Sequence, residues 1–147
     1  MPKIAMFVLA AAVTAGVSAP TAHAAHSRMQ FLSPSGDVGC QMGTAPSGVA
    51  FARCTADQHS WVAAESDVCF DATGGDDVAL AEGEAPCVGT GMSPLFFTGH
   101  SAPPSLNRGD QRSVGSITCT VEVTGVSCVD SMTGNGFRVS RERYQLT

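Results

Sequence analysis

Lysine is almost absent from this chain of 147 residues. Its single lysine stands at position 3, whereas residues 25–147 carry seven arginines against thirteen acidic residues. The formal net charge of the whole chain is −5. A protein that binds the phosphates of nucleic acids generally needs a basic surface. The charge balance therefore argues against a general nucleic-acid binder.

The motifs of common catalytic and metal sites are also missing. The chain has no Cys-x-x-Cys pair, no H-E-x-x-H, no G-x-S-x-G and no P-loop. If all six cysteines are oxidised, no thiol nucleophile remains. We expect no catalytic residues, no metal and no cofactor, and we predict that the protein is not an enzyme. The weaker alternative is a small hydrolase that uses paired carboxylates, but this requires a sizeable cleft.

Long apolar runs are confined to the N-terminus. Met1-Pro2-Lys3 precedes an apolar run of about 14 residues, and Ala22-His23-Ala24 follows it. This pattern is typical of a signal peptide, whereas a membrane helix needs about 20 apolar residues. We predict a cleaved signal peptide over residues 1–24 and one secreted domain over 25–147. The domain is expected in the cell envelope or outside the cell, without stable membrane insertion.

What the exported part does contain is six cysteines, which suits folding outside the reducing cytosol. Six cysteines allow fifteen pairings, and sequence alone does not choose among them. Successive cysteines, however, bracket turn-rich segments such as residues 43–48 and 74–77. This favours three local disulfides: Cys40–Cys54, Cys69–Cys87 and Cys119–Cys128.

The most regular stretch is residues 115–146, which predicts a three-strand β-meander. Apolar and polar residues alternate from Ile117 to Val123, the pattern of a strand with one buried face. A two-residue turn would leave Cys119 only diagonal to Cys128, about 7–8 Å away and too far for an unstrained disulfide. A four-residue turn over 122–125 places the two cysteines opposite each other, and we favour it. Beyond the turn at residues 133–136, the parity of apolar residues changes within 140–143, which predicts a bulge or bend.

Short strands are also predicted earlier in the chain. Residues 29–32, 38–42, 49–54 and 78–80 carry strand signals, and the parity of the third segment predicts a bulge near Ala52-Arg53. There is no internal sequence repeat and no amphipathic helix pattern. The fold class is therefore all-β: a small disulfide-bonded barrel or two-layer sandwich of about six to eight strands, with the C-terminal three-strand meander.

Acidic residues crowd the middle of the chain, where neither lysine nor arginine occurs between Arg53 and Arg108. The members are Asp57, Glu65, Asp67, Asp71, Asp76, Asp77, Glu82 and Glu84. Such a cluster can hold calcium, but the spacing does not match an EF-hand, and acidic loops are more often simply solvated. Trp61, the only tryptophan, is expected in the core, with a binding hot spot as the alternative.

Five of the seven arginines lie in the last third of the chain. They are Arg108, Arg112, Arg138, Arg141 and Arg143. One hypothesis is salt-bridging with the acidic middle. The other is a binding surface for an anionic ligand, such as a phosphate- or carboxylate-bearing polymer of the cell envelope.

Four motifs resemble those of a protein family. They are SPSGDVGC from Ser33, GSITC from Gly115, TGVSC from Thr124 and TGNGFRVSRERYQL from Thr133. Together they are similar to an uncharacterised family of small secreted proteins of mycobacteria and related actinobacteria, with SPSGN-x-x-C, G-x-x-TC…GVTC and TGHGF-x-x-SR-x-x-Y. Asp37 stands where Asn is usual, Asn135 where His is usual, and Leu106-Asn107-Arg108-Gly109 departs from an LPYG-like stretch. The resemblance implies an exported, disulfide-bonded β-domain and no known activity.

The function expected from the sequence is that of a non-enzymatic binding module. Its partner would be an anionic envelope polymer, or a secreted or host protein. The alternative is an inhibitor of a secreted protease or hydrolase that presents a rigid loop over residues 89–107. That segment is rich in Gly, Pro and Ser and contains Leu95-Phe96-Phe97, an apolar cluster expected to pin it.

Overall fold

The structure is a computed structural model that describes residues 28–70, 75–89 and 102–147. These residues form ten strands and one short 3-10 helix, Glu65–Asp67. The strands are β1 Met29–Leu32, β2 Val38–Thr44, β3 Ala50–Ala56, β4 Asp77–Ala81, β5 Cys87–Gly89, β6 Gln111–Val114, β7 Ile117–Val121, β8 Gly125–Asp130, β9 Gly136–Ser140 and β10 Tyr144–Leu146. The prediction of six to eight strands was too low.

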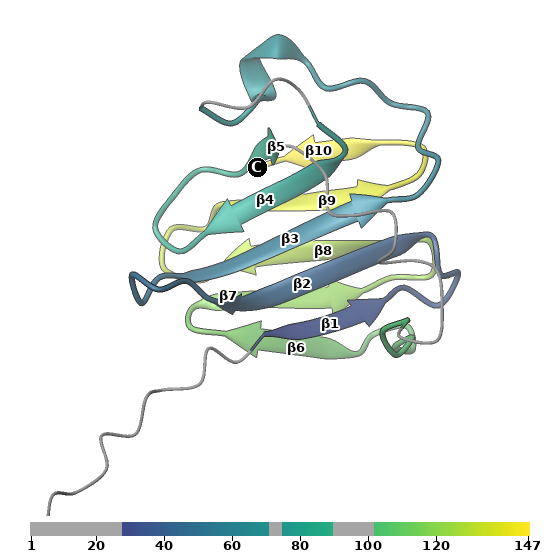
Figure 1. Ribbon diagram of the computed structural model, residues 1–147, viewed down its shortest axis with the longest axis horizontal. Coiled ribbons are helices and arrows are strands. Elements are labelled where there is room, and N and C mark those ends of the chain that lie inside the picture. Colours follow the sequence, from purple (N-terminus) through teal and green to yellow (C-terminus); the bar gives the residue numbers. More distant parts are fainter. Residues whose placement is uncertain (1–27, 71–74, 90–101) are drawn as a thin grey trace, which may run out of the picture.

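The strands form two five-stranded antiparallel sheets in which spatial order follows chain order. The first sheet runs β1-β2-β3-β4-β5 and the second β10-β9-β8-β7-β6. Figure 1 shows the first sheet lying over the second. The predicted all-β class is confirmed, and of its two architectures the two-layer sandwich is the one observed, because the sheets do not close into a barrel.

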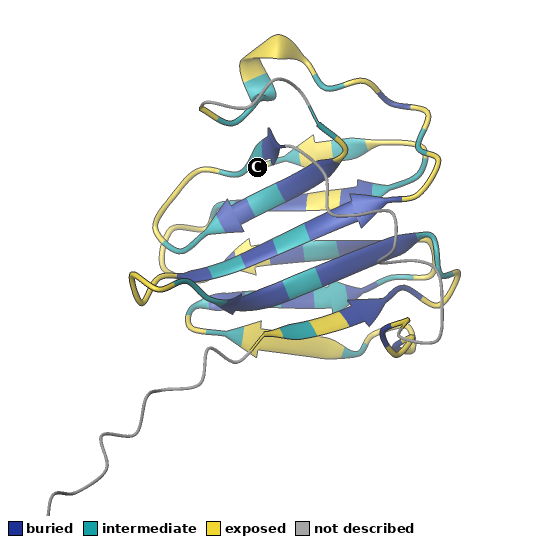
Figure 2. Ribbon diagram, in the orientation of Figure 1, coloured by how far each residue is buried: buried dark blue, intermediate teal, exposed yellow. Residues whose placement is uncertain are grey.

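The core lies between the sheets and follows from the period of two along each strand. Its largest fully buried side chains include Phe31, Met42 and Leu80 from the first sheet and Ile117 and Val139 from the second. Figure 2 shows the resulting alternation of buried and less buried residues along the strands, with β6 exposed at one edge. Trp61 is only 9% exposed and belongs to the core cluster, as predicted.

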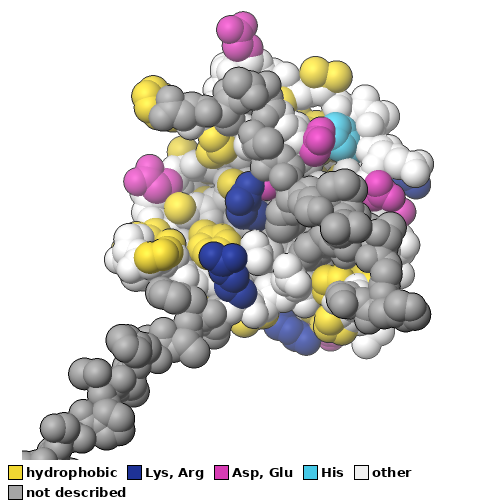
Figure 3. Space-filling view, viewed as in Figure 1, with side chains coloured by type: hydrophobic (Ala, Val, Ile, Leu, Met, Phe, Trp, Pro, Cys, Tyr) yellow, Lys and Arg dark blue, Asp and Glu magenta, His cyan; other side chains and the backbone are white. Residues whose placement is uncertain are grey.

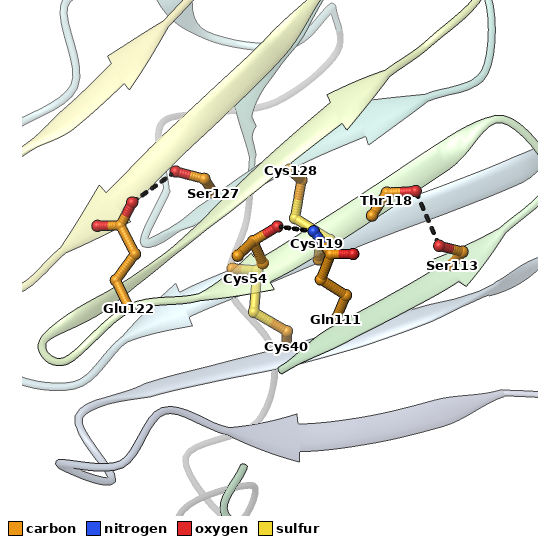
Figure 4. The surroundings of a disulfide bond; sticks show 10 residues. Cys40, Cys54, Gln111, Ser113, Thr118, Cys119, Glu122, Ser127 and Cys128 are labelled. Carbon is orange, nitrogen blue, oxygen red and sulfur yellow. Dashed lines mark hydrogen bonds between the residues drawn. A yellow bond between two sulfur atoms is a disulfide. The ribbon is translucent and has the colours of Figure 1, made fainter. Parts of the chain in front are cut away.

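Three disulfides reinforce this core, and their pairing is the one that the sequence favoured: Cys40–Cys54, Cys69–Cys87 and Cys119–Cys128. Two of them join directly opposite residues, one pair across β2 and β3 and the other across β7 and β8. Figure 4 shows these two bridges. Their cysteines are at most 1% exposed. The predicted register of the β7–β8 hairpin is therefore confirmed, with Val121 opposite Val126.

The predicted C-terminal meander is present and is part of a longer one. It contains β7, β8 and β9, and the strands β6 and β10 extend it on either side. The change of parity at residues 140–143 is a hairpin turn rather than a bulge, because Tyr144 pairs with Val139 and Leu146 with Phe137. What we predicted as one bent return strand is thus two antiparallel strands.

The bulge predicted near Ala52-Arg53 is wrong. The ladder between β2 and β3 is continuous from Val38–Ala56 to Thr44–Ala50. The residues of β3 that face the core are Ala50, Ala52, Cys54 and Ala56. The parity argument failed because neither Val49 nor Phe51 belongs to this buried set. Val49 precedes the strand, and Phe51 lies on its outer face.

Candidate functional site

The most distinctive open feature of the molecule is a groove on the outer side of the second sheet. It consists of two hollows of about 340 and 450 Å³ that share Glu122, Thr124 and Arg138. The first hollow extends over Ser140, Glu142, Arg143, Tyr144 and Gln145, and the second over Arg108, Gly109, Thr120, Val121 and Val123. We call these two hollows together the arginine groove.

Four segments of the chain build the arginine groove. The chain before β6 supplies Arg108, the β7–β8 turn supplies Glu122, β9 supplies Arg138, and the β9–β10 turn supplies Arg143. The turn is held in place because the amide of Glu122 donates to the carbonyl of Gly125 over 2.9 Å. Gly125 must be a glycine, since an added Cβ would overlap the carbonyl oxygen of Val139 on β9. The absence of a side chain at Gly125 thus allows β8 to approach β9 closely.

One ion pair occupies the centre of the arginine groove. Arg138 Nη2 lies 2.5 Å from Glu122 Oε2, and Ser127 Oγ donates to Glu122 Oε1 over 3.0 Å. The Arg138 side chain is nevertheless 54% exposed. Because an exposed pair of this kind contributes little to stability, an incoming anion can compete with Glu122 for the guanidinium at low cost.

The other two arginines of the groove are available. Arg108 and Arg143 are both exposed, and among the residues that the structure describes neither guanidinium has an ion-pair or hydrogen-bond partner. Guanidinium groups offer paired N–H donors that match carboxylate and phosphate oxygens. The groove therefore presents hydrogen-bond donors for an anionic group at each end. Between them lies the Arg138–Glu122 ion pair, which an anion could displace.

The structure brings together three of the five arginines singled out from the sequence. Arg141 lies outside both hollows, and its Nη1 is 3.7 Å from Asp37 Oδ1. Arg112 also lies outside them, on the edge strand β6, and donates to the carbonyl of Gln111. No arginine of the last third pairs with an acid of residues 57–84 within the described ranges. Within these ranges the arginines of the last third and the acidic segment therefore do not form salt bridges with each other.

The acidic segment does not form a cation site in the part of the chain that the structure describes. No three acidic, histidine or cysteine residues there gather closely enough to hold a metal ion. Figure 3 shows acidic and basic side chains dispersed over the face of the first sheet. Asp71, which the calcium hypothesis also included, lies outside the described residues.

Aromatic residues instead fasten this segment to the second sheet. Trp61 stacks on His59 at 3.8 Å between ring centroids and meets Tyr144 edge-on at 4.9 Å. Its indole N–H donates to the carbonyl of Ser140. The ring nitrogens of His59 face the carbonyl of Trp61 and the carboxylate of Asp76. These interactions leave His59 engaged in structure rather than free as a catalytic base.

The sequence did not indicate that two carboxylates, those of Asp77 and Asp130, are fully buried. Hydrogen bonds, chiefly from the Ser116 hydroxyl, lower the pKa of Asp130 to about 2. Burial raises the pKa of Asp77, although Arg53 lies 2.6 Å from its Oδ2. The other oxygen of Asp77 has no hydrogen-bond partner, nor does the hydroxyl of Thr55 opposite it. Neither carboxylate lines the arginine groove.

Asn135 has a structural role. Its side-chain amide donates to the carbonyl of Glu84 over 3.0 Å and so ties the β8–β9 turn to the β4–β5 turn. In the resemblance noted above this position carries a histidine. The hydrogen bond in this chain involves the turn backbone and no titratable group.

Comparison with family models, with curated proteins and with solved structures finds no match to this chain. Within the described ranges, no helix is long and apolar enough to cross a membrane. The predicted signal peptide lies outside the described residues, as do residues 90–101 of the proposed inhibitory loop. Both remain predictions.

Proposed function

We propose that this protein is an exported, non-enzymatic binding module that recognises an anionic polymer through the arginine groove. The observation that carries the proposal is that Arg138 lines two adjoining hollows, one of which is also lined by Arg143 and the other by Arg108. Three disulfides support action outside the reducing cytosol. The envelope or the extracellular space is the proposed place of action.

The charges of the groove favour a ligand whose negative groups are separated by hydroxyl groups. Glu122 and Glu142 lie in the same hollow as Arg138 and Arg143. Carboxylates repel a densely charged polyanion, whereas they accept hydrogen bonds from hydroxyl groups. A polymer that combines hydroxyls with spaced acidic groups therefore fits better than polyphosphate or nucleic acid.

Calorimetry with polygalacturonate, inorganic polyphosphate and neutral dextran tests the proposal at low and high ionic strength. We expect polygalacturonate to bind best, with an affinity that falls as salt screens the arginines. The double variant Arg108→Gln/Arg143→Gln removes two charge-assisted interactions with the polymer. It should weaken binding about tenfold for each of them, so about a hundredfold in total.

The matched control is Arg112→Gln/Arg141→Gln, which removes the same charge from the same third of the chain but outside the groove. It should change the affinity by less than about threefold, because it removes only screened, long-range attraction. Equal effects of the two double variants would show that the binding depends only on nonspecific charge attraction. No binding of any polyanion by the wild type would remove the proposed function.

A further inference from the structure

The outer faces of the two sheets differ in a way that the arginine groove alone does not explain. On the first sheet, outward-facing Leu32, Thr55 and Asp77 are buried, although Gln30 is exposed and Gln41, Phe51 and Arg53 are half-buried. On the second sheet, the outward-facing side chains are half-buried or exposed. Among the described residues, no outward-facing side chain of the second sheet is buried, from β6 to β10.

Strand register aligns five polar side chains in one row across this open face. The directly paired residues, from edge to edge, are Gln111, Thr120, Ser127, Arg138 and Gln145. Neighbouring strands lie about 4.8 Å apart, so the row spans about 19 Å. Thr120, Arg138 and Gln145 also line the arginine groove, and the row therefore follows the groove across the strands.

The chemistry of the face is that of hydroxyls and amides rather than of charges. Arg138 is the only charged residue at the outward-facing positions of β6–β10. Solvated surfaces usually carry about 25–35% charged residues. Ser113 bonds to Thr118, and Gln111 Nε2 donates to Thr120 Oγ1 (Figure 4). These pairs keep the side chains oriented and leave further donors and acceptors unused, since a hydroxyl or an amide can make several hydrogen bonds.

We infer that the row is a subsite series for an extended acidic polysaccharide, whose hydroxyls bind along Gln111, Thr120 and Ser127 and whose acidic groups meet the arginines. The inference rests on the proposed function and names its ligand class. Neutral side chains that both donate and accept match sugar hydroxyls, which also do both. The mixed charges of the groove select against polymers as densely charged as polyphosphate, which have no hydroxyl groups between their negative charges. A ligand that spans the row gains hydrogen bonds that a single anionic sugar cannot make.

Galacturonate oligomers of increasing length, measured by calorimetry, test this inference. The affinity should rise with length until the oligomer spans about 19 Å, and then level off. Gln111→Ala removes the end of the row without touching an arginine. It should leave galacturonic acid monomer binding unchanged and weaken the longest oligomer about fivefold, the worth of one neutral hydrogen bond.

Gln30→Ala is the matched control, because Gln30 is an exposed glutamine on β1, the edge strand of the other sheet. It should change neither the affinity for the monomer nor the affinity for the longest oligomer. If the monomer and the oligomers bind with equal affinity, the row is not a series of subsites, although the anion site of the groove would still be supported. Binding of polyphosphate without any galacturonate would overturn the polysaccharide class but not the groove. The absence of all polyanion binding would overturn the proposed function itself.

Discussion

Asp130 shows how a single buried carboxylate can set the acid stability of this domain. Its oxygens accept hydrogen bonds from the Ser116 and Thr133 hydroxyls and from the amides of Gly83 and Met132. Gly83 belongs to the β4–β5 turn of the first sheet, so this carboxylate joins the two layers. Its charge is therefore stabilised by the folded state specifically.

The pH dependence follows from the pKa of Asp130, which is about 2 in the folded protein against an ordinary value of 3.8. The stabilisation is present above about 3.8 and is lost as the pH falls toward 2. Melting temperatures measured over this range should fall more steeply for the wild type than for Asp130→Asn. Parallel curves for the two proteins would contradict the assignment. At neutral pH, Asp130→Asn should melt lower.

Asp77→Asn is the control of opposite sign. Burial raises the pKa of Asp77, so its contribution is fully present below 3.8 and is lost as the pH rises through the folded value. Removing it should make the melting temperature fall more steeply on acidification above pH 3.8, and should leave the slope between pH 3.8 and 2 unchanged.

These residue roles could be predicted from the sequence only in part. The alternation in β8 that places Val126 and Cys128 inward also places Asp130 inward. What the alternation cannot supply is its partner Gly83, which lies 47 residues away in the chain. The arginines show the same limit, because Arg141 and Arg143 are two residues apart but only Arg143 faces the groove.

At the scale of elements, the three disulfides differ in burial and in the loops they close. Cys119 and Cys128 are at most 1% exposed and close a loop of sequence separation 9. Cys69 and Cys87 are half-buried and close one of separation 18. Doubling a loop adds only about 0.6 kcal/mol of closure entropy, whereas two buried sulfur atoms contribute about 1.6 kcal/mol at the value of a buried methylene group. The difference in sulfur burial should therefore affect the free energy of unfolding more than the difference in loop length does.

The double variant Cys119→Ala/Cys128→Ala should accordingly lose more stability than Cys69→Ala/Cys87→Ala. We expect losses of about 4 and 3 kcal/mol respectively, within the usual range for native disulfides. Urea unfolding of both variants beside the wild type measures the difference. A larger loss for the Cys69–Cys87 variant would show that loop length dominates.

The hairpins of the second sheet were predictable where local signals agreed. In β7 and β8, alternation and the cysteine geometry pointed to one register. At residues 140–143 the only signal was a change of parity, which a bulge and a chain reversal produce alike. The reversal is decided by the pairing of Tyr144 with Val139 and by the closing bond from the Ser140 amide to the Arg143 carbonyl. Such pairing cannot be read from a local pattern.

At the scale of the whole molecule, the two sheets repeat one arrangement. Each is a five-strand meander in chain order, and in each a buried disulfide joins the second strand to the third at directly opposite residues. No repeat was visible in the sequence because the spacings differ: the disulfides span 14 and 9 residues. The similarity of the two sheets lies in their topology and register. The packing of one sheet on the other brings the Glu82 carboxylate of the first layer to the amide of Ser116 in the second.

The sandwich as a whole depends on its disulfides, since three bridges worth about 2–4 kcal/mol each rival the total stability of an ordinary domain. Reduction should proceed in two stages because only the Cys69–Cys87 bridge is partly exposed. Mild reductant should open that bridge first and leave the arginine groove able to bind. Complete reduction under denaturant, followed by its removal, should lower the melting temperature by more than about 20 °C or prevent refolding. Mass spectrometry of alkylated cysteines identifies the stage, and calorimetry of the same sample reports folding. An unchanged melting temperature after complete reduction would mean that the core alone supports the fold.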